Sequence, residues 1–317
     1  MAVIGIDLGG TKITGAVFDN EGNMLHKVSS LLEHKQGSQV GALVRSTIDH
    51  LISFYNIADI QSVGICVPGI ANSKTGKIWA PNIKGWDSYP LQEEIKNHIN
   101  DPSVKVDIAS DRTCYILGET WKGAAIGCGN ALFIAVGTGI GIGILVDGKI
   151  LHGHGDIVGA AGWLALETPY LDEYETCGCF ESQASGNGIA WQARKIIKDN
   201  ILFKNSSLYN KNVETIIAQD IFAAYEQKDP LAKFVLGKAI KMWGMAAANL
   251  VSLLNPEKII WGGGIFGPAS QFLDDIYKEA CKWAQPIGIC QVSFEQSILC
   301  GDAGLYGAGH LAILSLK

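Results

Sequence analysis

The sequence predicts a mixed α/β protein of two domains, and three observations support this fold class. Short apolar segments typical of strands alternate with longer segments of helical periodicity. A strand, a glycine-rich turn, a second strand and an Asp-containing turn near the N-terminus recur in the same order near the middle of the chain. The 317 residues are also more than one hydrophobic core usually accommodates. We therefore expect a duplicated α/β unit with helices covering its sheets.

The individual elements follow from apolar periodicity and from turn residues. Strands are expected near residues 3–8, 13–18, 62–67, 104–109, 132–136, 142–146, 258–261 and 291–294. Helices are expected near 39–56, 90–99, 112–121, 184–200, 214–226, 231–254 and 269–284, with a last one from about Gly301. Residues 200–212 are the most loop-like internal stretch. The repeat predicts a first domain at 1–120 and a second at 121–300, with the C-terminal helix 301–317 packing back on the first.

Composition and charge exclude several classes of protein. A hydrophobic content of 48% with mixed charge excludes disorder, and a net charge of −6 without any basic run argues against nucleic-acid binding. Residues 127–146 carry no charge, but their six glycines favour a buried hairpin over a membrane helix. Early glycines and Asp7 argue against a signal peptide, and eight scattered cysteines are typical of reduced thiols. We expect a cytoplasmic protein without a membrane partner.

The first glycine-rich turn predicts a phosphate site. A buried strand ends in Asp7-Leu8-Gly9-Gly10-Thr11-Lys12 and continues as a second strand, which is a hairpin rather than the strand–loop–helix of a P-loop. Glycines let a backbone approach a polyanion closely, and Thr11 and Lys12 can donate to phosphate oxygens. Asp7 stands where a carboxylate could hold a hydrated Mg²⁺. An ordinary tight hairpin is the alternative explanation.

A second turn and a third glycine cluster extend this interpretation. Gly137-Thr138-Gly139 follows an apolar strand in the middle of the chain, so that two hairpins could clamp a phosphate chain from both sides of a cleft. Gly262-Gly263-Gly264 follows the strand at 258–261 and would permit backbone contact with the adenosine end of a nucleotide. It is equally compatible with a simple strand-to-helix turn.

A candidate base and a candidate sugar loop lie in the first half. Asp111 stands between a strand end and a helix start, where it could accept the proton of a substrate hydroxyl as that hydroxyl attacks a γ-phosphate. On spacing alone a helix N-cap is the favoured alternative for Asp111. The loop of residues 80–87 contains Asn82, which could bond to sugar hydroxyls or belong to a solvated turn.

Taken together, these motifs resemble the ROK sugar kinases, which share the actin-like (hexokinase-type) ATPase fold, a duplicated ribonuclease-H-like unit with an inter-domain cleft. The resemblance covers essentially the whole chain and rests on ordered segments: residues 7–12, Pro68-Gly69, Pro81-Asn82 with Trp86, Asp111, residues 137–141, 159–162, 178–181, 262–264 and 301–304. It implies ATP between the two hairpins and the turn at Gly262, and a sugar beside Asp111 as catalytic base. It further implies sugar contacts from Gly69, Asn82, Ser110 and Glu181, and a homodimer.

The chain departs from the family where the sugar would bind. The family usually follows Gly-Ala-Ala-Gly with Glu-Ile-Gly-His, and residues 163–166 read Trp-Leu-Ala-Leu here. Losing the sugar-binding Glu and His should change the preferred sugar or weaken its binding. Trp163 could stack on the apolar face of a sugar or belong to the core. Ser110 and Arg112 replace the usual Asn and Ala around the base.

The family's zinc segment is also altered. Asp172 and Tyr174 occupy the first two ligand positions, and of the usual cysteines Cys177 and Cys179 remain. Structural zinc requires four sulfur or nitrogen ligands, so we expect no structural zinc.

The leading hypothesis is therefore an ATP- and Mg²⁺-dependent kinase acting on a hydroxyl of a hexose or related sugar. A non-catalytic sugar sensor is the alternative. The family's regulators carry an N-terminal helix-turn-helix domain, for which a first strand at about Val3 leaves no room, so a regulator would have to act through a partner protein. An actin-like ATPase without a sugar substrate is a third hypothesis, and the resemblance at Asn82 and Glu181 argues against it.

Overall fold

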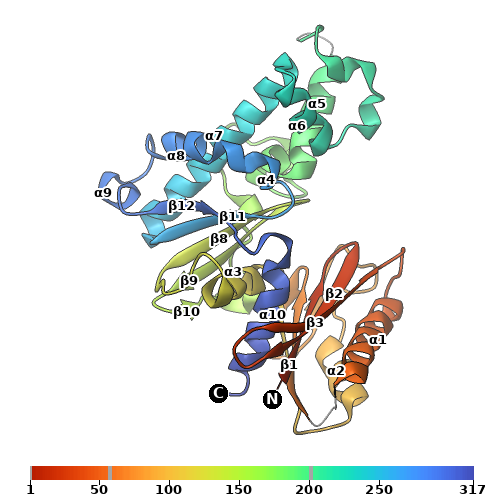
Figure 1. Ribbon diagram of the computed structural model, residues 1–317. Helices are drawn as coiled ribbons and strands as arrows, with labels where there is room; N and C mark the ends of the chain where they lie inside the picture. Colours follow the sequence, from red (N-terminus) through yellow and green to blue (C-terminus); the bar gives the residue numbers. More distant parts are fainter. Residues whose placement is uncertain (1, 56–58, 200–202) are drawn as a thin grey trace.

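The computed structural model describes residues 2–55, 59–199 and 203–317, and its two halves lie one above the other in Figure 1. Each half is built on a five-stranded sheet, with the order β3-β2-β1-β4-β7 in the first and β10-β9-β8-β11-β12 in the second. In both sheets three antiparallel strands are followed by two strands parallel to the first of them. The two halves therefore repeat one topology, as the recurring motif predicts, and the mixed α/β fold class is confirmed.

The strands have the following bounds. Those of the first sheet are β1 (Ala2–Leu8), β2 (Lys12–Asp19), β3 (Met24–Leu31), β4 (Ile60–Val67) and β7 (Lys105–Ser110). Those of the second sheet are β8 (Ala131–Val136), β9 (Ile140–Val146), β10 (Lys149–Ile150), β11 (Lys258–Gly262) and β12 (Ser293–Gln296). A separate short hairpin consists of β5 (Ile70–Ala71) and β6 (Ile78–Trp79).

Helices cover both faces of the first sheet. On one face lie α1 (Ser38–Phe54) and α2 (Leu91–Ile99), which share a core with Ile4 and Ile6 of β1. On the other face α10 (Ala303–Leu314) packs against Val3 of β1. Next to α10, α3 (Asp111–Lys122) lies between the two sheets and also packs on β8 and β9 (Figure 1).

Glycine allows α10 to approach its neighbours closely. A methyl group on Gly64 of β4 would lie 2.0 Å from the Ala308 carbonyl oxygen, and one on Gly307 would lie 1.8 Å from the carbonyl oxygen of Cys114. Both distances are far below van der Waals contact distance, so the backbone of α10 packs directly on the backbones of β4 and α3 where it crosses them. This packing fixes α10 and α3 between the sheets.

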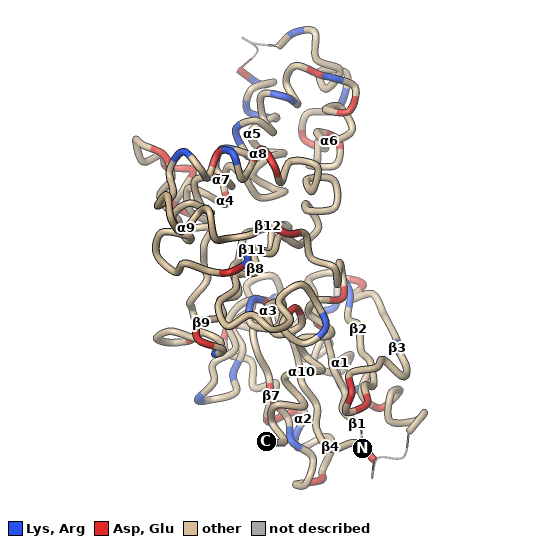
Figure 2. The backbone as a smooth tube through the Cα atoms, turned by 60° about the vertical axis from the view of Figure 1, so that its left-hand side comes forward, with Lys and Arg blue, Asp and Glu red and all other residues tan. Residues whose placement is uncertain are grey.

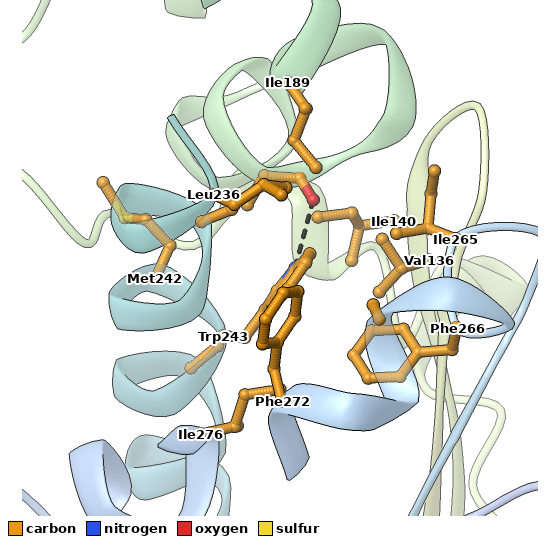
Figure 3. Close-up of a cluster of buried hydrophobic side chains, with 14 of the residues drawn as sticks. Val136, Ile140, Ile189, Leu236, Met242, Trp243, Ile265, Phe266, Phe272 and Ile276 are labelled. Atoms are coloured by element: carbon orange, nitrogen blue, oxygen red, sulfur yellow. Dashed lines mark hydrogen bonds between the residues drawn. The ribbon is translucent and has the colours of Figure 1, made fainter. Parts of the chain in front are cut away.

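The helices of the second half cover the outer face of its sheet. They are α4 (Cys179–Ala184), α5 (Gly186–Asp199), α6 (Ala218–Glu226), α7 (Pro230–Leu254), α8 (Leu273–Ala280) and α9 (Pro286–Ile289). Figure 3 shows the core between them, where Trp243 of α7 donates from Nε1 to the Ala184 carbonyl oxygen at 3.0 Å. Val136 and Ile140 belong to this core, so the turn between β8 and β9 is anchored at both of its ends.

The structure differs from the sequence prediction in several elements. The edge strand β3 was not predicted, because its mostly exposed and polar residues give no apolar run. The expected helix near 184–200 corresponds to α5, and the short helix α4, which ends at Ala184 before the extended Ser185, was not predicted. The region 269–284 begins with a 3₁₀ turn, and only residues 273–280 are α-helical. The expected ends at residues 56 and 200, and the start of the loop 200–212, lie outside the described residues.

The distribution of charged residues and the structure of the uncharged segment 127–146 agree with the expectations from composition. Acidic and basic residues are interspersed along both halves in Figure 2. Residues 127–146 form the hairpin of β8 and β9, as their glycine content predicts. Within the described residues, no helix is both long and apolar enough to cross a membrane.

Candidate active site

Asp7 lies near the end of β1 in a narrow space beside α10. A methyl group on Gly304 would lie 2.8 Å from Asp7 Oδ2, so glycine at that position leaves room for the carboxylate. Burial raises the pKa of Asp7 to about 6, against the opposing effect of a hydrogen bond from the Cys66 thiol. Asp111 adds to the rise through its charge, and Lys12 opposes it. The structure thus places Lys12 and Asp111 close enough to Asp7 for their charges to change its pKa.

This raised pKa predicts a pH dependence of stability in magnesium-free buffer. The ordinary pKa of 3.8 rises to about 6 in the folded chain, so between these values the folded state binds more protons than the unfolded state. The free energy of unfolding is therefore expected to fall by up to about 3 kcal/mol as the pH rises from about 4 to about 6, and to stay low above that. In Asp7→Asn this loss should disappear, leaving the variant more stable than the wild type at pH 7 in urea titrations.

The exposed Asp172→Asn is the matched control, and it should keep the wild-type pH profile. If Asp7→Asn shows the same pH profile as the wild type, the carboxylate of Asp7 does not carry this effect.

The two glycine-rich turns are similar in their backbone hydrogen bonds and in their exposure. In the turn between β1 and β2 the Gly9 amide donates to the Lys12 carbonyl oxygen at 2.9 Å, and Gly10, Thr11 and Lys12 are exposed. In the turn between β8 and β9 the Gly137 amide donates to the Gly139 carbonyl oxygen at the same distance, and Thr138 is exposed. The exposed hydroxyls and amine are free of the core and available to a ligand.

The third glycine cluster lies directly beside the second turn. A methyl group on Gly263 would lie 2.5 Å from the Val136 carbonyl oxygen, which also accepts a hydrogen bond from the Ile265 amide at 3.0 Å. Gly263 has φ +90°, a left-handed conformation that favours glycine. Gly262 ends β11, and Gly264 is exposed. The structure thus joins residues 137–139 and 262–264 into one glycine-lined edge of the second sheet.

Asp111 is the first residue of α3, and it is not the N-cap. The cap is Ser110, whose Oγ accepts from the Thr113 amide. Sequence spacing favoured a capping role for Asp111, and this was wrong because the serine one position earlier performs it. Asp111 Oδ1 accepts only a short-range bond from the Arg112 amide at 2.8 Å among the hydrogen bonds described. Burial raises the pKa of Asp111, and the charge of Arg112 opposes the rise.

Glu181 of α4 is fixed between two turns of the second half. Its Oε2 accepts a hydrogen bond from the Ile140 amide at 2.6 Å, and a methyl group on Gly162 would lie 2.8 Å from its Cβ. Burial raises the pKa of Glu181 as well. Trp163, at the end of the 3₁₀ turn 161–163, is 58% exposed, so the alternative that it belongs to the core was wrong.

Asn82 lines a cavity whose lining does not include Asp111 or Glu181. A cavity of about 650 Å³ opens beside the turn of the first hairpin, and it is lined by Gly10, Thr11, residues 31–36 and residues 81–84. Asn82 is exposed on this wall. Asp111 and Glu181 are not among its lining residues. Asn82 is thus placed beside the candidate phosphate turn, and its contact with a sugar stays a prediction.

The donor set of the zinc segment does not fit a tetrahedral zinc ion. Tyr174 is buried, and its hydroxyl donates to Glu167 Oε2 at 3.2 Å and accepts from Gln183 Nε2 at 2.7 Å. Lys238 pairs with the same carboxylate at 3.4 Å. Within the described ranges, no three His, Cys, Asp or Glu residues form a cluster that could hold a metal ion. Tyr174 therefore takes part in hydrogen bonds at a position where the family's zinc segment has a ligand.

Three contacts of the site were not found by sequence analysis. The Cys66 thiol donates a hydrogen bond to Asp7, and Gly304 leaves room for the Asp7 carboxylate. The Arg112 guanidinium donates to carbonyl oxygens in two loops that are distant in sequence. The partners of Arg112 are 43 and 45 residues away in the chain, and no sequence pattern signals such pairs. Gly304 lies in one of the segments of the family resemblance, which could have drawn attention to it.

Known proteins resemble this chain over its whole length. The model of the ROK family matches residues 3–314. A glucokinase from Halalkalibacterium halodurans is 33% identical over 97% of this chain and 94% of its own length. The structure of a ROK family glucokinase from Streptomyces griseus, in complex with glucose and AMPPNP, superposes with a TM-score of 0.80 at 26% identity over 98% of this chain and 99% of its own.

A regulator has the same fold. A ROK family transcriptional regulator, a homologue of the E. coli Mlc protein, has a TM-score of 0.82 at 25% identity, covering 98% of this chain and 77% of the regulator. The match of the family model across nearly all residues and the identity to the glucokinase agree. The chain therefore belongs to the ROK family.

Proposed function

We propose that the chain is an ATP-dependent sugar kinase that transfers the γ-phosphoryl group of ATP to a hydroxyl of a hexose or related sugar. The observation that carries this proposal is the placement of Asp111. Its carboxylate is buried at the start of α3, its capping role is taken over by Ser110, and its charge acts on Asp7 of the phosphate hairpin. The glucokinases among the relatives support a sugar as the acceptor.

The chemistry assigned to Asp111 is general-base catalysis. Its carboxylate accepts the proton of the sugar hydroxyl while that oxygen forms a bond to the γ-phosphorus and the bond to the β–γ bridging oxygen breaks, so that ADP leaves. The raised pKa favours proton acceptance, because burial makes the charged carboxylate more costly than it would be in water. Most of the rate enhancement then comes from positioning and charge stabilisation.

The phosphates are assigned to the two hairpin turns. Thr11, Lys12 and Thr138 would donate to phosphate oxygens, and the glycines at 9–10, 137, 139 and 262–264 would let backbone amides approach the nucleotide. Asp7 would hold a hydrated Mg²⁺, because its carboxylate is a hard oxygen donor for which Gly304 leaves room. When bound, the ion would neutralise phosphate charge.

The sugar is assigned to the region of Gly69, Ser110 and Glu181, with Asn82 on the wall of the first hairpin. Trp163 is exposed, follows Gly162, which lies against Glu181, and would stack on a sugar face. Since Trp163 and Leu166 replace polar residues of the family, we propose a sugar preference different from that of the family's glucokinases. We further propose a cytoplasmic homodimer with domains at 1–120 and 121–300, the helix from about 301 to 317 belonging with the first.

A ligand-sensing regulator is the second candidate, because the Mlc homologue shares the fold over 98% of this chain. The two candidates are separated by ADP release from Mg-ATP with a panel of hexoses, amino sugars, N-acetylated sugars and pentoses. The kinase predicts sugar-dependent release. Sugar binding without any release would favour the regulator.

Glu181 provides a test of the sugar site itself. Glu181→Gln is expected to raise the KM of the best sugar about tenfold, because a charged acceptor of the sugar hydroxyl is lost, and to change the KM of ATP by less than about twofold. Glu175→Gln, an exposed glutamate of the same segment, is the matched control and should leave both constants unchanged. Equal changes in the two KM values for Glu181→Gln would contradict the assignment of Glu181 to the sugar.

A further inference from the structure

Two segments from the two halves meet next to the start of α3. One is the hairpin 70–79, formed by β5 and β6, and the other is the loop 151–159 that follows β10. Ser73 of the hairpin donates from its amide and from its hydroxyl to Asp156 Oδ2 of the loop, both at 3.0 Å. A small cavity of about 40 Å³, lined by residues of both segments and by Ser110, lies between them.

Arg112 makes a second connection between the same segments. Its Nη2 donates to the carbonyl oxygen of Gly69, immediately before the hairpin, at 3.2 Å, and its Nη1 donates to the carbonyl oxygen of Ile157 in the loop at 3.3 Å. The two carbonyl groups belong to different halves of the chain. One guanidinium therefore bridges the halves one residue away from Asp111.

Gly141 makes room for this side chain. A methyl group on Gly141 of β9 would lie 2.9 Å from Arg112 Cγ and 3.0 Å from Arg112 Cδ, and one on Gly159 would lie 1.9 Å from the Ile142 carbonyl oxygen. Gly69 and Gly159 have φ of +88° and +83°. The backbone therefore turns sharply at one end of the bridge and two residues after Ile157, its other end. The Gly159 carbonyl oxygen accepts from the Ile142 and Ala161 amides, both at 2.8 Å, which ties the loop to β9.

The chemistry of arginine suits this bridge better than that of lysine. A guanidinium presents several N–H donors in a rigid plane and stays charged when buried, whereas an ammonium is a compact, strongly hydrated point charge. Hydrogen bonds from a charged donor are stronger than those between neutral groups. A lysine would keep the positive charge but could not hold two carbonyl oxygens from opposite sides in the same geometry.

We propose that Arg112, together with Asp156, clamps the hairpin 70–79 to the loop 151–159 and thereby positions the sugar-binding loops of both halves around Asp111. Arg112 is a positioning residue in this proposal. The clamp between hairpin and loop is argued from the hydrogen bonds alone. The positioning of sugar-binding loops rests on the proposed kinase function.

The test compares Arg112→Met, Arg112→Lys and Asp156→Ala with the wild type. Arg194→Met is the matched control, because Arg194 of α5 also donates to a backbone carbonyl oxygen, that of Ile216, at 2.9 Å from Nε, away from the site. Hydrogen exchange followed by mass spectrometry reports on the clamp without requiring any activity. Exchange in peptides covering 69–79 and 151–161 should rise about tenfold or more in Arg112→Met and Asp156→Ala, less in Arg112→Lys, and not in Arg194→Met.

Kinetics test the positioning role. In Arg112→Met the KM of the sugar should rise about tenfold while the KM of ATP stays within about twofold, and Arg112→Lys should restore part of the loss. Wild-type exchange in both peptides of Arg112→Met and Asp156→Ala overturns the clamp. Faster exchange with an unchanged sugar KM overturns the positioning role. If the wild type phosphorylates no sugar, the proposed function fails, while the exchange experiment still decides the clamp. Should Arg112→Met fail to fold, Arg112→Lys and Asp156→Ala carry the test.

Discussion

Replacing Asp111 by asparagine is expected to lower kcat for sugar phosphorylation by about 10²–10⁴-fold. The amide cannot accept the proton of the attacking hydroxyl, while its size and its place at the start of α3 remain. Since Ser110 caps the helix, the substitution should leave folding intact. The KM of ATP should change by less than about twofold, because the phosphates are assigned to the hairpin turns. Steady-state kinetics with the preferred sugar provide the measurement.

The matched control for this substitution is Asp275→Asn, an aspartate of α8 that pairs with Lys278 on the surface. Surface pairs of this kind contribute little to stability, so activity and folding should be those of the wild type. Undiminished kcat in Asp111→Asn would remove Asp111 from the reaction and leave the proposed mechanism without a base.

Replacing Gly307 by alanine is expected to destabilise the protein by about 3 kcal/mol or more. The added methyl group would lie 1.8 Å from the Cys114 carbonyl oxygen and 2.4 Å from the carbon of the same group, both backbone atoms of α3 that cannot rotate away. Helices α3 and α10 would have to separate between the two sheets. The midpoint of thermal unfolding should fall by about 5 °C or more.

Gly237→Ala is the matched control, because Gly237 also lies inside a helix, α7, but apart from the neighbouring backbone of that helix no atom lies within 4 Å of the added methyl group. Alanine has the higher helix propensity, so this variant should be as stable as the wild type or up to about 1 kcal/mol more stable. A Gly307→Ala variant with the wild-type unfolding midpoint would show that α3 and α10 can move apart at little cost.

The repeated fold could be predicted because its signals are local. The glycine turns at 9–10 and 137–139 interrupt apolar runs, and each run is long enough for the strands that the structure contains. The end of α7 was predicted from Asn255-Pro256, and Asn255 indeed adopts the left-handed conformation that ends the helix. Strand β3 was missed because an exposed edge strand lacks the apolar pattern on which prediction depends.

The candidate site was less predictable because its contacts join distant parts of the chain. Sequence motifs indicated Asp7 and Asp111 separately, but not that burial would raise the pKa of both. The bridge from Arg112 to Gly69 and Ile157 depends on how the halves pack, and so does the position of Glu181 beside the Ile140 amide. Conversely, spacing suggested a capping role for Asp111 that Ser110 performs, since neighbouring capping residues cannot be distinguished without the backbone.

The most direct test of the proposed function is phosphorus NMR of the protein with Mg-ATP and each sugar of the panel. The account predicts a new phosphomonoester signal that depends on the sugar and grows as ADP forms, and that Asp111→Asn reduces about 10²–10⁴-fold in rate. Release of inorganic phosphate with every sugar and without any phosphomonoester would instead identify an ATPase. Tight sugar binding with unchanged ATP would contradict the kinase and identify a sensor.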